Sequence, residues 1–136
     1  PPRVFRGGPC VVVWGARPGL YRDLAGLRVF PEGRGRHLFF SLGAAVLRVF
    51  NPTATVQPPG NPDIPVPPHG ATGPGHVCFA MPREDIAAMR ERLAAAGVQI
   101  DTMYDWPNGA RSLYVRDPAG NSVEFAEPWL WDGLKG

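Results

Sequence analysis

The sequence predicts a single α+β domain made of two similar modules, each with the element order β-α-β-β-β. A proline-rich stretch over residues 51–75 cannot supply the hydrogen bonds of a sheet and indicates an extended connection. Strand, helix and turn signals follow in the same order on either side of it. We therefore predict one domain of residues 1–136, with module one at about 9–52, a linker at 53–74, module two at 75–128 and a tail at 129–136.

Module two opens with the apolar strand "HVCFA", at residues 76–80, and continues into a helix over 82–97. Proline suits the first helical position, acidic residues favour the first turn, and glycine favours the end. These signals are Pro82, Glu84, Asp85 and Gly97. An apolar stripe with helical spacing would bury one face of this helix against a sheet. It consists of Ile86, Met89, Leu93 and Ala96.

Three further strands complete module two. We predict them in "VQIDTMYDW", "RSLYVRD" and "SVEFAEP", separated by the turns "PNGA" and "DPAGN". In the second turn, proline suits the first central position and glycine can adopt positive φ. The turn and the strand after it form the most specific piece of the sequence.

Module one repeats this order less regularly. "CVVVW" predicts a strand, "RPGLYRDLAG" about two turns of helix, and "LRVFPE", "RHLFFSL" and "AVLRVFNP" three more strands. When the last strands of the two halves are aligned, Arg48 occupies the place of Glu124, and Pro52 that of Pro128. The helix is the weakest match, because it is shorter and carries Gly19 near its start.

The composition excludes several classes of protein. The chain has 136 residues, 44% of them apolar, and 14 basic against 12 acidic residues. This balance, without a run of Lys or Arg, argues against nucleic-acid binding. No apolar run approaches the ~20 residues that a membrane span needs, and no secretory signal is visible, so we expect a cytoplasmic protein. The two cysteines, Cys10 and Cys78, make no disulfide framework.

The duplicated module resembles the glyoxalase/bleomycin-resistance/extradiol-dioxygenase superfamily, also called vicinal oxygen chelate proteins. The best-matching pieces are "LYRDLAGLRVF", "GHVCFAMP" and "YVRDPAGNSVEFAEP". The resemblance implies that the modules curl into an open cup with helices on its outer face. It also implies a homodimer, and a metal bound by residues on the first and last strands of each module.

His76 and Glu124 match two of those family ligand positions. Alternate residues of a strand share a face, so Val77 and Phe79 would leave His76 on the cup side, and Glu124 would lie there by the same rule. An imidazole and a carboxylate suit Zn, Fe, Ni or Mn. A lone histidine at a strand edge is more often solvated. Glu124 could instead pair with Arg48.

The matching half of the site departs from the family pattern. Arg48 stands where a carboxylate is needed, and arginine cannot bind a metal. The position on the first strand falls on Gly8 or Cys10. A third ligand would therefore come from Cys10, His37, His69 or a dimer partner. Both cysteines are also ordinary candidates for small buried residues.

Aromatic residues predict a pocket for a small organic molecule. Tyr104, Trp106 and Tyr114 lie in the outer strands of module two, and Arg48 could orient a carboxylate or phosphonate. The resemblance implies a metal-dependent lyase, isomerase or dioxygenase, with Glu124 as a catalytic proton carrier. The alternative is a metal-free binder of the drug-sequestering type. A third alternative, a structural interaction module, is supported only by the tail tryptophans, Trp129 and Trp131. We also expect a twofold dimer whose interface includes the tail near Trp129 or Trp131.

Overall fold

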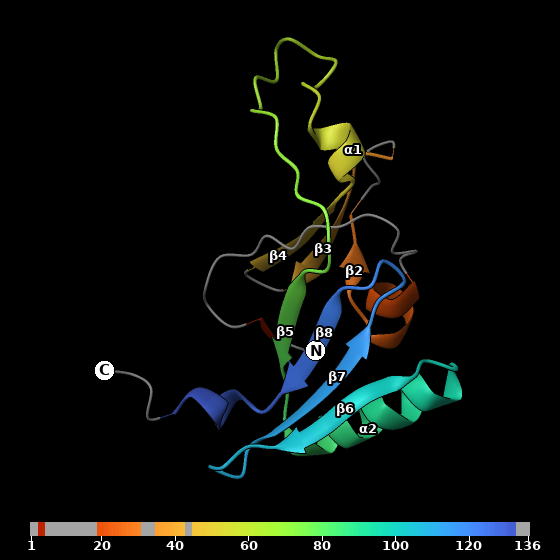
Figure 1. Cartoon of the computed structure of the whole chain (residues 1–136), viewed down its shortest axis with the longest axis vertical. Coiled ribbons are helices and arrows are strands. Elements are labelled where there is room, and N and C mark those ends of the chain that lie inside the picture. Colours follow the sequence, from red (N-terminus) through yellow and green to blue (C-terminus); the bar gives the residue numbers. More distant parts are fainter. Residues whose placement is uncertain (1–2, 5–18, 31–34, 43–44, 133–136) are drawn as a thin grey trace.

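The computed structural model describes residues 3–4, 19–30, 35–42 and 45–132, which form a mixed α+β protein with two open sheets (Figure 1). The predicted α+β class is confirmed. The described strands make two separate sheets rather than one curled sheet. The predicted first strand, over residues 10–14, lies outside the described residues, as does Cys10.

The larger sheet has five strands in the order β1-β5-β8-β7-β6. These are β1 (Arg3–Val4), β5 (His76–Ala80), β8 (Ser122–Ala126), β7 (Arg111–Arg116) and β6 (Ile100–Asp105). The two central strands, β5 and β8, run parallel, and the other neighbouring pairs are antiparallel. The pairing of β1 with β5 was not predicted from the sequence.

Helix α2 (Arg83–Ala95) covers one face of this sheet. Pro82 is the residue just before the first turn rather than its first member, a difference of one position. Ile86, Met89 and Leu93 are buried and belong to the same core as Val77, Phe79, Val123 and Phe125 of the central strands. The predicted Ala96 member of the stripe is exposed. With this face covered by α2, the alternate side chains of β5 and β8 lie on the other face.

Module one contributes the three-stranded sheet, in the order β2-β3-β4. Its strands are β2 (Arg28–Val29), β3 (His37–Leu42) and β4 (Ala45–Phe50). The helical segment before them is a single π-helical stretch, η1 (Gly19–Leu24), instead of two α-helical turns. Leu20 and Tyr21 of η1 join Phe40 of β3 in the core that module two also shares.

A buried hydrogen-bond cluster links the two modules at the "DPAGN" turn. The Tyr21 hydroxyl donates to Asp117 Oδ2 at 2.7 Å, and the Asn121 side chain donates to the same atom at 2.8 Å. The Ala119 and Asn121 backbone N–H groups donate to Oδ1. Gly120 has φ of 87°, the positive value that this turn requires.

The proline-rich connection begins with a helical turn that was not predicted, α1 (Pro52–Thr55). Asn51 caps this turn, because its side chain accepts a hydrogen bond from Thr53 N at 3.1 Å. Residues 56–75 then contain no helix or strand. After β8 the chain forms a short 3-10 helix, η2 (Pro128–Trp131). None of the described helices is long and apolar enough to cross a membrane.

Candidate functional site

The site residues of module two converge on the sheet face that α2 leaves uncovered. Cys78 of β5 and Tyr114 of β7 are the register partners of Glu124 on either side. His76 lies at the start of β5, and its Nε2 is 3.1 Å from Glu124 Oε2. The structure thus brings together the two residues that the sequence singled out, one from each of two neighbouring parallel strands.

Glu124 is almost fully buried, with 5% of its side chain exposed. The Ser112 hydroxyl donates to Glu124 Oε1 at 2.7 Å. The Trp106 indole N–H in turn donates to Ser112 Oγ at 2.8 Å. One oxygen of the carboxylate is therefore engaged within the protein, while the other faces His76, whose side chain is 52% exposed.

The contacts of His76 leave a position for a proton or a metal ion between the two residues. His76 Nδ1 lies 3.2 Å from the Ser122 carbonyl oxygen. A carbonyl oxygen can only accept, so Nδ1 carries the hydrogen. In a neutral imidazole Nε2 is then an acceptor, and it faces the acceptor Oε2 at 3.1 Å. The contact is favourable only when a proton or a metal ion lies between Nε2 and Oε2.

The 3.1 Å separation fits a metal ion as well as a proton. Two donor atoms ~2.1 Å from one ion and 3.1 Å apart subtend roughly 95° at it, which suits neighbouring ligands. The bond from Nδ1 to a backbone carbonyl is also the usual outer contact of a metal-binding histidine. The pair can therefore supply two ligands.

The described residues do not complete the coordination. Among them, no group of three His, Cys, Asp or Glu residues is placed to bind one ion. His37 stacks on Phe39 with ring centroids 4.2 Å apart, and His69 lies edge-on to Phe50 at 4.5 Å. Both histidines are thus packed on aromatic rings of the three-stranded sheet.

Two neighbours of Glu124 keep their protons to unusually high pH. Burial, followed by contact with Glu124, raises the pKa of Tyr114 to about 12. The same two causes raise the pKa of the Cys78 thiol far above its ordinary value. At neutral pH both groups are therefore donors beside the carboxylate, and Cys78 is not a reactive thiolate.

The predicted aromatic residues of module two lie on the same face. The rings of Tyr104 and Trp106 meet edge to face at 5.1 Å, and the Tyr114 ring is stacked near His76 at 6.3 Å. Arg48 lies elsewhere, opposite Phe39 on the three-stranded sheet and 5.8 Å from the Phe50 ring centre. The ion pair that Glu124 makes is with His76.

Sequence reasoning did not assign a role to Ser112 or Cys78. Each lies two residues from a predicted site residue on the same strand, Ser112 beside Tyr114 and Cys78 beside His76. The alternation of strand residues placed Cys78 on the site face, and the same rule applied to Tyr114 would have placed Ser112 there. What the sequence cannot give is the cross-strand register that sets them against Glu124.

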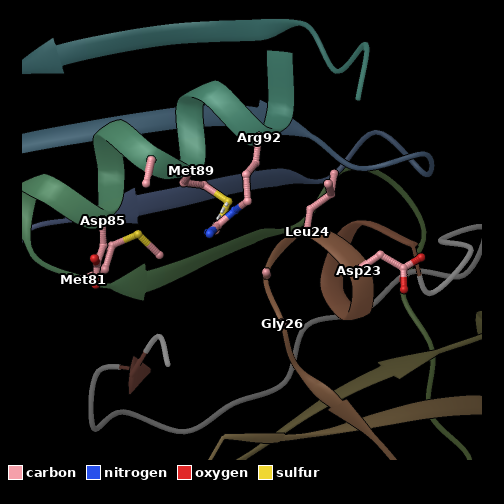
Figure 2. A pocket seen from close by; sticks show the side chains of 9 residues that line it. Asp23, Leu24, Gly26, Met81, Asp85, Met89 and Arg92 are labelled. Carbon is pink, nitrogen blue, oxygen red and sulfur yellow. Dashed lines mark hydrogen bonds between the residues drawn. The ribbon is translucent and has the colours of Figure 1, made fainter. Parts of the chain in front are cut away.

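A cleft of about 350 Å³ lies away from this site, beside α2 (Figure 2). Met81, Asp85, Met89 and Arg92 line it from the α2 side, and Asp23, Leu24 and Gly26 from the end of η1. It lies on the helix-covered side of the sheet and contains none of the predicted site residues. The open face at Glu124 is thus the better candidate on chemical grounds.

Comparison with known proteins identifies the class. Residues 20–125 match the family described as the Glyoxalase/Bleomycin resistance protein/Dioxygenase superfamily. The match spans well over half of the chain, so the chain belongs to this superfamily. Its members bind small-molecule substrates, commonly use divalent metals and often form dimers. No curated protein sequence matches the chain.

Solved structures add a more particular likeness. A lactoylglutathione lyase from Agrobacterium tumefaciens is 32% identical, with 93% of this chain and 97% of that chain covered and a TM-score of 0.82. FosX fosfomycin resistance proteins from Mesorhizobium loti and Listeria monocytogenes are 15% and 14% identical, with TM-scores of 0.61 and 0.66. The former match covers 94% of this chain and 95% of that one, and the latter 95% and 94%. At these identities the two FosX proteins show a shared fold alone.

Proposed function

We propose that this chain is a metal-dependent lyase or isomerase acting on a small organic molecule at the His76–Glu124 pair. The observation that carries the proposal is the 3.1 Å approach of Nε2 and Oε2, which leaves a position for a metal ion between them. The relative at 32% identity, named lactoylglutathione lyase, supports lyase chemistry. Dioxygenase chemistry, which the sequence left equally open, has no comparable support.

The chemistry divides between the ion and the protein. A divalent ion bound by Nε2 and Oε2, whether zinc, iron, nickel or manganese, would supply a Lewis acid for a substrate oxygen. When its bond to the ion loosens, Glu124 Oε2 would take a proton from a substrate carbon and return it to the neighbouring one, because Ser112 engages Oε1. Tyr114, with a pKa of about 12, can donate a hydrogen bond to a substrate oxygen at neutral pH.

The rest of the pocket would bind and orient the substrate. Tyr104 and Trp106 offer an aromatic wall beside the carboxylate. Arg48 is proposed to bind an anionic end of a substrate that extends toward the three-stranded sheet. If so, Arg48→Ala raises KM for an anionic substrate and leaves kcat close to that of the parent. An unchanged KM would remove Arg48 from the site.

The metal is tested by calorimetry on protein purified without a histidine tag. We expect the parent to bind one Zn²⁺, Mn²⁺, Ni²⁺ or Fe²⁺ per chain, and His76→Ala to bind it ~10-fold or more weakly. Glu84→Ala is the control, since it removes a possible ligand in the first turn of α2, on the helix-covered side of the sheet. The first assay starts from glutathione and the α-ketoaldehyde that cleavage of lactoylglutathione would release, and follows the ultraviolet absorbance of the thioester as it forms. Metal binding that is equal in parent and His76→Ala would refute the assignment.

A second function is favoured by the incomplete donor set. The described residues supply two ligands where a stable site needs at least three, and Arg48 stands at the position that corresponds to Glu124. A metal-free binder of small molecules would leave a proton, instead of an ion, between Nε2 and Oε2. Absence of binding for all four ions, together with retained binding of an organic ligand, would establish this alternative.

The active assembly is proposed to be a twofold dimer. Trp129 and Trp131 of the tail are 37% and 40% exposed, and tryptophan is enriched at interfaces. We expect light scattering to give twice the chain mass at micromolar concentration, and Trp129→Ala to shift the equilibrium toward monomer. A monomeric parent under those conditions would contradict the proposal.

A further inference from the structure

We propose that Ser112 and Trp106 are positioning residues for Glu124, which fix one carboxylate oxygen inside the protein and present the other to the reaction. This inference rests on the proposed role of Glu124. The chain of contacts is short throughout: 2.8 Å from the Trp106 indole to Ser112 Oγ, and 2.7 Å from Ser112 Oγ to Glu124 Oε1.

The direction of each hydrogen bond follows from the groups involved. An indole N–H can only donate, so Ser112 Oγ accepts from Trp106. The Ser112 side chain is fully buried, and its hydroxyl has a single hydrogen, which must go to Glu124 Oε1. Neither bond can reverse, unlike a chain of hydroxyls or water molecules. Oε1 is therefore always an engaged acceptor.

The fixed polarity has a consequence for Glu124. With Oε1 accepting from Ser112, that oxygen is held toward the interior of the protein. Oε2 faces His76 Nε2 at 3.1 Å. The proposed ligand and proton carrier is thus a single defined atom. Loss of the Ser112 hydroxyl would free the carboxylate to rotate about its last torsion.

Trp106 is placed to act as an anchor for this arrangement. It follows β6 directly, and its backbone N–H bonds to the Ala110 carbonyl oxygen at 2.8 Å. Its ring packs against the small apolar cluster of Ala110, Ala126 and Leu130. The sequence suggested Trp106 only as an aromatic lining residue. Its polar edge points instead at Ser112, so the same ring serves both the pocket wall and the carboxylate.

The first measurement needs no metal. The Trp106 indole N–H signal in a ¹H–¹⁵N spectrum reports the bond to Ser112. We expect this signal to move strongly in Ser112→Ala, to move in the same direction by less in Glu124→Gln, and to return near the parent position in Ser112→Thr. Ser41→Ala on the other sheet is the matched control and should leave it unchanged. A signal that is unmoved by both Ser112→Ala and Glu124→Gln would overturn the proposal.

The second measurement is Zn²⁺ affinity by calorimetry. Ser112→Ala should bind Zn²⁺ ~10–100-fold more weakly than the parent, the usual effect of removing an outer contact of a metal ligand. Ser112→Thr should restore most of the affinity, and Trp106→Phe should lie between. Equal affinity in parent and Ser112→Ala overturns the positioning role. If the parent binds no ion, the proposed metal function fails, and the indole signal alone decides the present proposal.

Discussion

Removal of the Tyr21 hydroxyl should destabilise the protein, because that hydroxyl links the two modules. It donates to Asp117 Oδ2 at 2.7 Å, and both side chains are buried. A hydrogen bond to a charged group contributes ~1.5–3 kcal/mol to the free energy of unfolding. Asp117 retains three other donors in Tyr21→Phe, from Ala119 and Asn121. We therefore expect a loss near the middle of that range, about 2 kcal/mol.

Urea denaturation measures this loss directly. With a slope of ~1–3 kcal/mol per molar urea, the midpoint should fall by about 1 M without a change of slope. Tyr104→Phe is the matched control, since that ring is 48% exposed and its loss of a hydroxyl should change stability by under ~0.5 kcal/mol. Equal midpoints for Tyr21→Phe and Tyr104→Phe would refute the reasoning. A changed slope would show instead that the unfolded or folded state had altered.

Glu127, Tyr114 and Gly120 each give a further prediction. Burial opposes the shift, but hydrogen bonds from Arg83 and from a backbone N–H lower the pKa of Glu127. The stability that Glu127 contributes is therefore present above the ordinary glutamate pKa and is lost as pH falls through the lower pKa of the folded state. Glu127→Gln should flatten this loss when the free energy of unfolding is measured against pH. The pH dependence that Tyr114 contributes has the opposite sign. Its pKa is raised to about 12, so the stability that it contributes is lost as pH rises above ~10. Tyr114→Phe should remove a step of tyrosinate absorbance near pH 12. Gly120→Ala should cost ~1–2 kcal/mol in the same urea assay, because φ of 87° suits only glycine well, and no loss would contradict that reasoning.

The sequence predicts module two well because its signals are local. The start and stop signals place both ends of α2 to within two residues, and the "DPAGN" turn requires the positive φ that Gly120 adopts. His76 and Glu124 could be placed on one face because side-chain alternation depends only on the strand itself. Their proximity was an expectation from the family resemblance, since strand alternation does not say which strands are neighbours.

The remaining features depend on contacts between distant segments. The parallel pairing of β5 with β8 sets Cys78 against Glu124, and no local pattern encodes that register. The Ser112–Trp106 bond likewise depends on how β6 and the following turn return to β7. In module one, the helix signal was genuine but short, and tertiary packing of Tyr21 accompanies a π-helical form. Asn51 and Pro52 were local signals for α1 that the surrounding prolines concealed.

The proline-rich connection is anchored at both ends, which makes its middle a suitable place to lengthen the chain. At one end, His69 N bonds to the Thr55 carbonyl oxygen at 3.0 Å, and at the other, Gly75 N bonds to the Asn121 side chain at 2.7 Å. Residues 60–68, inside the loop that the Thr55–His69 bond closes, are all exposed. Each doubling of a flexible loop costs only ~0.6 kcal/mol in closure entropy. A reporter peptide or a whole guest domain inserted there should leave the hydrogen bonds of Glu124 intact, because His76, Ser112 and Trp106 all lie beyond the second anchor.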